Sequence, residues 1–215
     1  MIKKILKLFR KENNYGDNTV VLPISNKYIK IKIHGKNNKV IFSQDFPQNT
    51  RIHIEIYGDN NTVDLGCVYG NIKIMIGYAW VKTHNTLFKC GYGRINQGEF
   101  LLLENNTHIT IGDDCLFSWG ISFRCTDDHT IMDMNGNIIN HAKFIEIGNH
   151  VWIAKQVTVL KNTKILDNTV VGCNSVVAKQ FDKSNIVIAG NPARIIKENI
   201  KWDEKYINEA YNENI

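Results

Sequence analysis

From Ile147 onward, hydrophobic and polar residues alternate in blocks of six. The blocks read IGNHVW, IAKQVT, VLKNTK, ILDNTV, VGCNSV and VAKQFD. A period of six differs from the 3.6 of an α-helix and from the 2 of a single amphipathic strand. It fits short strands that turn a corner every six residues. The first residue of every block is aliphatic: Ile147, Ile153, Val159, Ile165, Val171 and Val177.

Three such blocks close one triangular coil, and successive coils stack as parallel strands about 4.8 Å apart. The aliphatic first positions then form a ladder inside the stack. Asparagine recurs at the same interval, and its short side chain tolerates the left-handed backbone that a tight corner needs. The pattern therefore predicts an all-β fold, a parallel β-helix. Small or β-branched residues fill the fifth positions, Val151, Val157, Thr163, Thr169 and Ser175, and the corner asparagines are Asn162, Asn168 and Asn174.

The upstream half carries the same theme less regularly. IKIHGKNNKV at 31–40 matches IEIYGDNNTV at 54–63 with a shift of 23 residues, and ITIGDDCLFSWGIS follows from Ile109. We interpret these segments as earlier coils with protruding insertions. Periodicity alone leaves two alternatives, a β-sandwich and a right-handed solenoid. The handedness of the winding cannot be settled by general rules, because parallel crossovers are normally right-handed.

The predicted organisation has three parts. Residues 1–15 form a basic N-terminal segment, and residues 16–192 form the β-helix with an insertion loop at about 129–146. Residues 193–215 form a C-terminal helical tail. The start, IKKILKLFRK, is either a simple terminal helix or an amphipathic helix that makes weak contact with anionic lipid.

The composition of the chain indicates where in the cell the protein is expected. The chain has 215 residues and no apolar run of about 18 that would cross a bilayer, and its charged start lacks a signal-peptide core. Five cysteines show no metal-ligand spacing, which favours a reducing cytoplasm, with the inner membrane face as a variant. The net charge of +5 is scattered, so nucleic acid is not indicated. The cysteines are Cys67, Cys90, Cys115, Cys125 and Cys173.

Residues 109–202 resemble the hexapeptide-repeat acyltransferases. The resemblance lies in the aliphatic-first repeats, in IEIGNHVWIA and in the closing VIAGNPARIIK. Within that superfamily, FRCTDDHTIMDMNGNIINHAKFIEIGNHVWIA is similar to capsular and lipopolysaccharide O-acetyltransferases. The resemblance implies left-handed winding and a homotrimer with active sites between subunits. It also implies acetyl-CoA as donor and, as acceptor, a hydroxyl of a bacterial surface glycan: capsule, lipooligosaccharide or sialic acid.

Transfer of an acetyl group to a sugar hydroxyl requires a general base, and histidine suits this role at neutral pH. His129 follows FSWGISFRCTDD, where the repeat breaks and a loop begins. The resemblance assigns the base to His129, and Asp127 or Asp128 is expected to orient its imidazole. The alternative is a loop histidine that only faces solvent.

Trp152 occupies the sixth position of its block, so we expect it at a corner with its ring outside the core. The resemblance places it near the thioester and the acceptor. The alternative is a tryptophan packed against the insertion loop. A backbone N–H in the turn of Ala154 and Lys155 is the candidate donor to the developing oxyanion.

The resemblance also assigns the cofactor site. The AGNPA turn is expected to lie close to the ligand, basic side chains to meet the phosphates of coenzyme A, and small residues to leave room for the pantetheine arm. The predicted cofactor-binding residues are Ala154, Lys155, Cys173, Lys179, Gly190, Asn191, Pro192, Arg194 and Lys197.

Two further histidines have competing interpretations. His141, with Asn140, is expected at the acceptor site. Alternatively, His129, His141 and His150 bind zinc, as histidines do in another enzyme family with this helix. We expect no metal, because the AGNPA turn and Trp152 belong to the acyl-transfer pattern.

Two other functions stay open at this point. One is N-acetylation of a nucleotide-linked amino sugar, but the G-x-G-x-x-G turn of a separate nucleotide-binding domain is missing ahead of the repeats. The other is a non-catalytic β-helix scaffold, which a regular ladder of exposed threonines would support. The interrupted repeats and the ligand-type turn favour the O-acetyltransferase.

Overall fold

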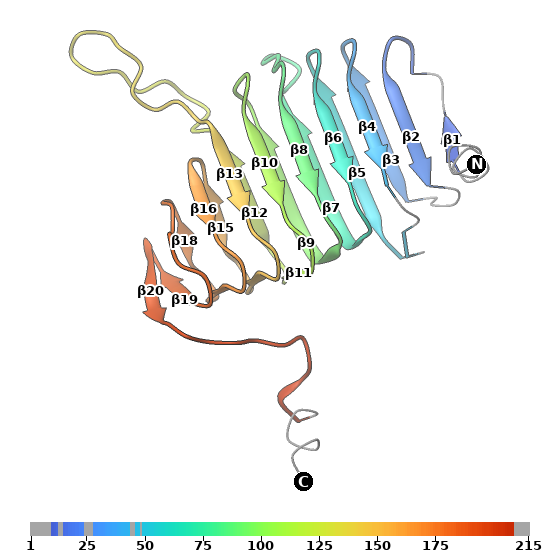
Figure 1. Ribbon diagram of the computed structural model, residues 1–215. Coiled ribbons are helices and arrows are strands. Elements are labelled where there is room, and N and C mark those ends of the chain that lie inside the picture. The colour runs from blue at the N-terminus through green and yellow to red at the C-terminus, as the bar shows by residue number, and fades with distance from the viewer. Residues whose placement is uncertain (1–9, 13–14, 24–27, 44–45, 48, 209–215) are drawn as a thin grey trace.

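A computed structural model describes residues 10–12, 15–23, 28–43, 46–47 and 49–208 of the chain. Within these ranges every named element is a β-strand, and the strands wind into an elongated parallel β-helix (Figure 1). No helix in the described ranges is long and apolar enough to cross a lipid bilayer. The expected N-terminal helix falls largely on residues 1–9, which lie outside the described ranges.

One face of the β-helix is an eight-stranded sheet. Its first strand, β1, pairs antiparallel with β2, and every later neighbour in this sheet is parallel. The strands, in spatial order, are β1 (Arg10–Glu12), β2 (Thr19–Pro23), β4 (Lys39–Phe42), β6 (Thr62–Leu65), β8 (Leu87–Cys90), β10 (His108–Ile111), β13 (Phe144–Ile147) and β16 (Thr163–Ile165).

A twelve-stranded sheet supplies the other two faces. The long strand β9 shows how, because its first part pairs with β11 and its second part with β12. The sheet therefore bends between two faces, and each coil has three sides. The strands are β3 (Ile29–His34), β5 (Arg51–Tyr57), β7 (Val68–Ile76), β9 (Gly93–Leu102), β11 (Cys115–Phe117), β12 (Ile121–Cys125), β14 (Trp152–Ile153), β15 (Thr158–Leu160), β17 (Val170–Val171), β18 (Val176–Val177), β19 (Val187–Gly190) and β20 (Ala193–Lys197).

The six-residue pattern is confirmed as the inner ladder of the C-terminal coils. All six aliphatic first positions are at most 4% exposed, and all five small fifth positions are fully buried. Asn162, Asn168 and Asn174 have φ angles of 60°, 57° and 54°, so each sits in the left-handed region, as predicted for the corners. Each six-residue block of the sequence therefore forms one side of a triangular coil.

The upstream match is confirmed as strand register. Ile31 pairs with Ile54, and Val40 pairs with Val63, each across the same shift of 23 residues. Buried amides join these coils at one corner. The Asn61 side-chain amide donates to Asn38 Oδ1 at 3.0 Å, and Asn61 Oδ1 accepts from the Thr86 N–H at 3.0 Å. The buried side chains of Asn38, Asn61 and Thr86 are therefore hydrogen-bonded to one another, which offsets the cost of burying them.

None of the five cysteines, all of which lie in the described ranges, forms a disulfide bond. Cys90, Cys115 and Cys125 are buried in the core, and burial raises the pKa of Cys115 and of Cys125 to about 12. These thiols stay protonated at neutral pH and act as small apolar residues.

The insertion occupies residues 126–143, between β12 and β13, which is three residues earlier than the expected range of about 129–146. Figure 1 shows this segment extending away from the stacked coils as a long loop. Residues 144–147 form β13 because Ile145 and Ile147 point into the core while the strand pairs with β10 and β16.

The prediction of a helix from residue 193 is wrong for its first part. Residues 193–197 form β20, which pairs antiparallel with β19 and covers an otherwise open sheet edge. Ala193 is buried there, at 1% exposure. Residues 198–206 then run without regular structure along the side of the β-helix (Figure 1), and residues 209–215 lie outside the described ranges.

Candidate active site

The stem of the 126–143 loop is closed by Asn140. Its side-chain amide donates to the His129 carbonyl at 2.8 Å and to Asp127 Oδ2 at 3.0 Å, while Asn140 Oδ1 accepts from the Ile131 N–H at 2.8 Å. One side chain therefore ties the outgoing strand of the loop to the returning one. Three of the predicted site residues, Asp127, His129 and Asn140, are brought together in this way.

A lysine from the next coil fixes the stem to the scaffold. Lys161 lies between β15 and β16, and its Nζ is 2.6 Å from Asp127 Oδ2; it also donates to the Asn140 carbonyl. Burial raises the pKa of Asp127, but hydrogen bonds from Lys161 and Asn140 and the lysine charge outweigh it, so the pKa lies below its usual range. Asp127 is therefore ionised at neutral pH and serves as an anchor.

His129 is exposed and lines a cavity of about 200 Å³ together with His141 and Thr130. Asp127 binds Lys161, and Asp128 binds Arg124 at 2.6 Å. Neither carboxylate contacts the His129 imidazole in this structure, so its orientation by Asp127 or Asp128 stays a prediction. Within the described part of the chain, the His129 imidazole has no side-chain partner.

The same cavity holds a histidine–carboxylate pair that the sequence did not reveal. Glu104 Oε2 lies 3.3 Å from His141 Nδ1, and both Glu104 carboxylate oxygens accept from the Ala142 N–H, at 3.1 and 3.0 Å. Glu104 comes from the coil before the loop, 37 residues away in sequence. No local motif joins these two residues, so only the packing of neighbouring coils could show the pair.

Trp152 lies in β14 and not at a corner, but its ring is outside the core as expected, at 38% exposure. It faces outward because Ile153, the next residue, faces inward. Its neighbour is Trp202 of the C-terminal tail, with ring centroids 6.0 Å apart. Within one chain, Trp152 therefore packs beside the C-terminal tail.

A strip of small residues follows Trp152 along one corner of the β-helix. Ile153, Val171 and Ile188 are paired in register, so the residues after them, Ala154, Gly172 and Ala189, stack over one another. An added Cβ on Gly172 would lie only 2.9 Å from the Ala189 Cβ. Gly172 and Ala189 extend the expected small-residue site. Gly172 could have been found from the sequence because it lies one coil, 18 residues, after Ala154, whereas Ala189 lies 17 residues after Gly172, and only the strand pairing places it.

The backbone at this corner offers one free donor. The Ala154 N–H donates to the Val171 carbonyl at 2.9 Å, and the Lys155 carbonyl accepts from the Asn174 N–H at 3.0 Å. The Lys155 N–H has no acceptor within the described residues. Of the two predicted oxyanion donors, the geometry therefore favours Lys155.

The AGNPA turn joins β19 to β20 at the C-terminal end of the same strip. Gly190 has a φ of 107°, and its N–H donates to Ser175 Oγ at 3.0 Å, while Ser175 Oγ–H donates to the Gly172 carbonyl at 2.7 Å. Asn191 and Pro192, joined by a cis peptide bond, are exposed at the tip. The remaining predicted cofactor residues, Cys173, Lys179, Arg194 and Lys197, are also exposed on these last coils.

The predicted site residues thus fall into two groups. The group around His129 sits where β12 leads into β13. Ala154 and the small-residue strip sit on the corner where β14 leads into β15, and Trp152 lies just before that corner, in β14. These are different corners of the coil, so one chain does not bring the two groups together. His150 lies at the third corner, stacked on Trp202, so the alternative zinc site of three histidines is not formed within the described residues.

The chain is similar to known transferases of the hexapeptide-repeat type. Residues 144–179 match the family described as bacterial transferase hexapeptide (six repeats). A polysialic acid O-acetyltransferase of Neisseria meningitidis is 36% identical over 194 residues, which cover 80% of this chain and 88% of the relative. A polysialic acid O-acetyltransferase of Escherichia coli O1:K1 is 43% identical over 104 residues, 48% of this chain and 34% of that protein.

The fold agrees with a solved structure. The polysialic acid O-acetyltransferase OatWY superposes with a TM-score of 0.68 at 30% identity, covering 87% of this chain and 93% of that chain. The likeness therefore extends over the irregular N-terminal coils as well as the regular repeats.

Proposed function

The chain belongs to the polysialic acid O-acetyltransferase family of hexapeptide-repeat transferases, and we propose that it acetylates a hydroxyl of a sialylated bacterial surface glycan. The observation that supports this most strongly is the 36% identity over most of both chains, together with an exposed loop histidine and a corner strip free of bulky side chains. We place the reaction in the cytoplasm, whose reducing conditions suit five cysteines that form no disulfide bond.

In the proposed reaction, acetyl-CoA supplies an acetyl thioester, the glycan oxygen bonds to its carbonyl carbon, and the carbon–sulfur bond breaks. His129 accepts the hydroxyl proton and returns it to the departing thiol sulfur. Its exposed imidazole, free of side-chain partners within the described residues, is available for both transfers. The Lys155 N–H donates to the carbonyl oxygen as negative charge develops there. The outward ring of Trp152 provides a flat apolar surface beside the reacting groups.

The residues of the corner fit a coenzyme A molecule. Ala154, Gly172 and Ala189 leave a path without bulky side chains, which suits the thin pantetheine arm. The exposed cations Lys179, Arg194 and Lys197 lie on the adjoining coils and would bind its phosphates. Gly190 to Pro192 close that end of the strip.

A homotrimer resolves the separation of the two groups of site residues. His129 lies at one corner of the chain, and Ala154, two residues after Trp152, lies at another. Three triangular rods packed side by side around a threefold axis place one corner of each against a different corner of its neighbour. The loop of one subunit then meets the strip of the next, and His141 with Asn140 faces the acceptor there. The left-handed winding belongs to this proposal as well.

The test is acetyl transfer by the purified protein to a panel of acceptors: polysialic acid, a neutral capsular polysaccharide and a nucleotide-linked amino sugar. We expect base-labile acetyl esters on the sialylated acceptor, detected by mass, with release of the free coenzyme thiol. Transfer to the amino sugar alone would assign the chain to N-acetylation. No transfer to any acceptor, with no binding of coenzyme A, would support a scaffold.

A further inference from the structure

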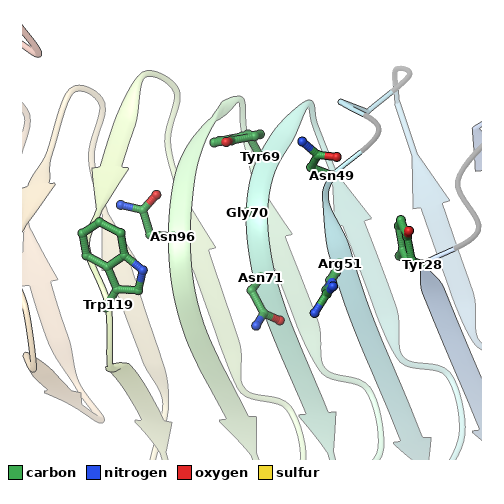
Figure 2. Close-up of a pocket in the computed structure, with 8 residues that line it drawn as sticks. All are labelled: Tyr28, Asn49, Arg51, Tyr69, Gly70, Asn71, Asn96 and Trp119. Carbon is green, nitrogen blue, oxygen red and sulfur yellow. The ribbon is translucent and has the colours of Figure 1, made fainter.

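A second cavity lies on the N-terminal coils, away from the loop and the AGNPA turn. It has a volume of about 350 Å³ and crosses several strands of the twelve-stranded sheet (Figure 2). Three aromatic rings are spread along it and are exposed to a similar extent: Tyr28 at 37%, Tyr69 at 40% and Trp119 at 56%. Flat apolar rings of this kind stack on the C–H faces of sugar rings.

Hydrogen-bonding groups alternate with the rings. Figure 2 shows Asn96 between Trp119 and Tyr69, and Asn71 and Arg51 between Asn96 and Tyr28. Each amide both donates and accepts, which matches sugar hydroxyls. The guanidinium of Arg51 lies 5.5 Å from the Tyr28 ring centroid and presents a planar fork that suits a carboxylate.

The surrounding charge is positive. Two residues beyond the row of Tyr28, Arg51 and Asn71, the outward positions Lys30, His53 and Lys73 stand in register on the same strands. Lys73 pairs with Glu99 at 2.5 Å, whereas Lys30 and Arg51 have no carboxylate partner among the residues that the structure describes. The cavity therefore attracts an anionic ligand.

The length of the groove exceeds one sugar unit. Tyr28 precedes β3 and Trp119 precedes β12, and β5, β7 and β9 lie between them. These are four strand spacings, roughly 19 Å. A groove of this length holds several linked sugar units, one after another across the coils.

The groove also leads into the small-residue strip. Asn96 and Ser118 follow paired residues on β9 and β11, and Ser118 precedes Ala154 in the same stack. The Trp119 carbonyl accepts from the Gln156 N–H at 2.9 Å, on the coil that carries Ala154 and Lys155. A chain bound in the groove is therefore directed along one corner towards the proposed acetylation site.

We propose that this groove binds sugar units of an anionic glycan chain other than the unit being acetylated, and so selects a polymer over a short acceptor. This rests on the proposed function for its link to turnover. Trp119 and Tyr69 stack on sugar rings, Asn71 and Asn96 bind hydroxyls, and Arg51 binds a carboxylate.

The test compares long polysialic acid with a sialic acid disaccharide as acceptors for Trp119→Ala and Arg51→Ala. We expect KM for the polymer to rise roughly tenfold in each variant, while kcat and the KM for the disaccharide stay within about twofold. Matched controls are Trp80→Ala, which removes a tryptophan at 81% exposure outside the groove, and Lys89→Ala, which removes an exposed cation on the other sheet. Both controls should behave as the unchanged protein.

An unchanged polymer KM in both groove variants would overturn the inference, as would an equal rise for the disaccharide. Binding of long polysialic acid without acetyl-CoA, measured by calorimetry, separates the groove from the reaction. If the unchanged protein transfers no acetyl group but binds the polymer, and Trp119→Ala weakens that binding, the proposed function fails and the groove stands. If polyglutamate competes as well as polysialic acid, the surface recognises charge alone and the glycan subsite is wrong.

Discussion

The indole of Trp202 stacks on the imidazole of His150, with ring centroids 4.0 Å apart and planes 13° from parallel. The Trp202 Nε1–H donates to the His150 carbonyl at 2.9 Å. A second tie follows two residues later, where Glu204 pairs with Arg94 at 2.6 Å. These contacts hold the tail across the side of the β-helix and beside Trp152, so the tail forms one wall of the surface that carries the predicted Trp152 site.

Replacing Trp202 should release the tail. Trp202→Phe keeps the stacking but loses the N–H donor, at a cost of about 1 kcal/mol in the free energy of unfolding, whereas Trp202→Ala should cost about 2–3 kcal/mol. Urea unfolding measures both, and limited proteolysis should cut the tail sooner in the alanine variant. Ile207→Ala, at a position 74% exposed, is the control. A Trp202→Ala variant as stable as that control would show that the tail contact contributes nothing.

The anchor of the loop should be sensitive to acid. The pKa of Asp127 is lowered in the folded protein, so its contribution to stability is complete above the ordinary aspartate pKa of about 3.9 and is lost as the pH falls through the lower folded value. NMR of the Asn140 side-chain amide should therefore show loop opening only below about pH 4. In Lys161→Met the loop should open at higher pH. Opening at the same pH in both proteins would contradict the role of Lys161.

The C-terminal coils could be predicted from the sequence, but the contacts between residues far apart in the chain could not. Six aliphatic positions and three corner asparagines specified the C-terminal coils because a six-residue period has few other geometric solutions. The pairing of Glu104 with His141 and the stacking of Trp202 on His150 join residues 37 and 52 positions apart, and no local pattern carries them. The sequence did not predict strand β20, because its backbone pairs with the edge strand β19 and that edge exists only in the folded protein.

Widening Gly172 should block the proposed cofactor path. Gly172→Val adds a side chain over the strip, and we expect coenzyme A to bind at least about tenfold more weakly by calorimetry. The new Cβ also crowds the Ala189 Cβ at 2.9 Å, so a loss of folding must be separated from a loss of binding. Gly172→Val combined with Ala189→Gly relieves that crowding. Binding that stays weak in the double variant supports the path, and binding that recovers fully assigns the defect to packing.

Active sites shared between subunits predict complementation. Two inactive variants, His129→Ala and Trp152→Ala, are expressed together with different affinity tags, and the mixed oligomers are purified. An interface between unlike subunits then pairs an intact loop with an intact strip, so acetyl transfer should reappear in the mixed fraction and not in either pure variant. Mixed oligomers without activity would place the whole site within one chain.

The most direct measurement is kcat for acetyl transfer to polysialic acid in His129→Ala and His141→Ala, followed by release of the coenzyme thiol and by product mass. We predict that the unchanged protein forms acetyl esters and that His129→Ala loses a factor of about 10² to 10⁴ in kcat with unchanged coenzyme A binding. His141→Ala should retain kcat within about tenfold. Full activity in His129→Ala together with a collapse in His141→Ala would contradict the assignment and give the base to His141, held by Glu104.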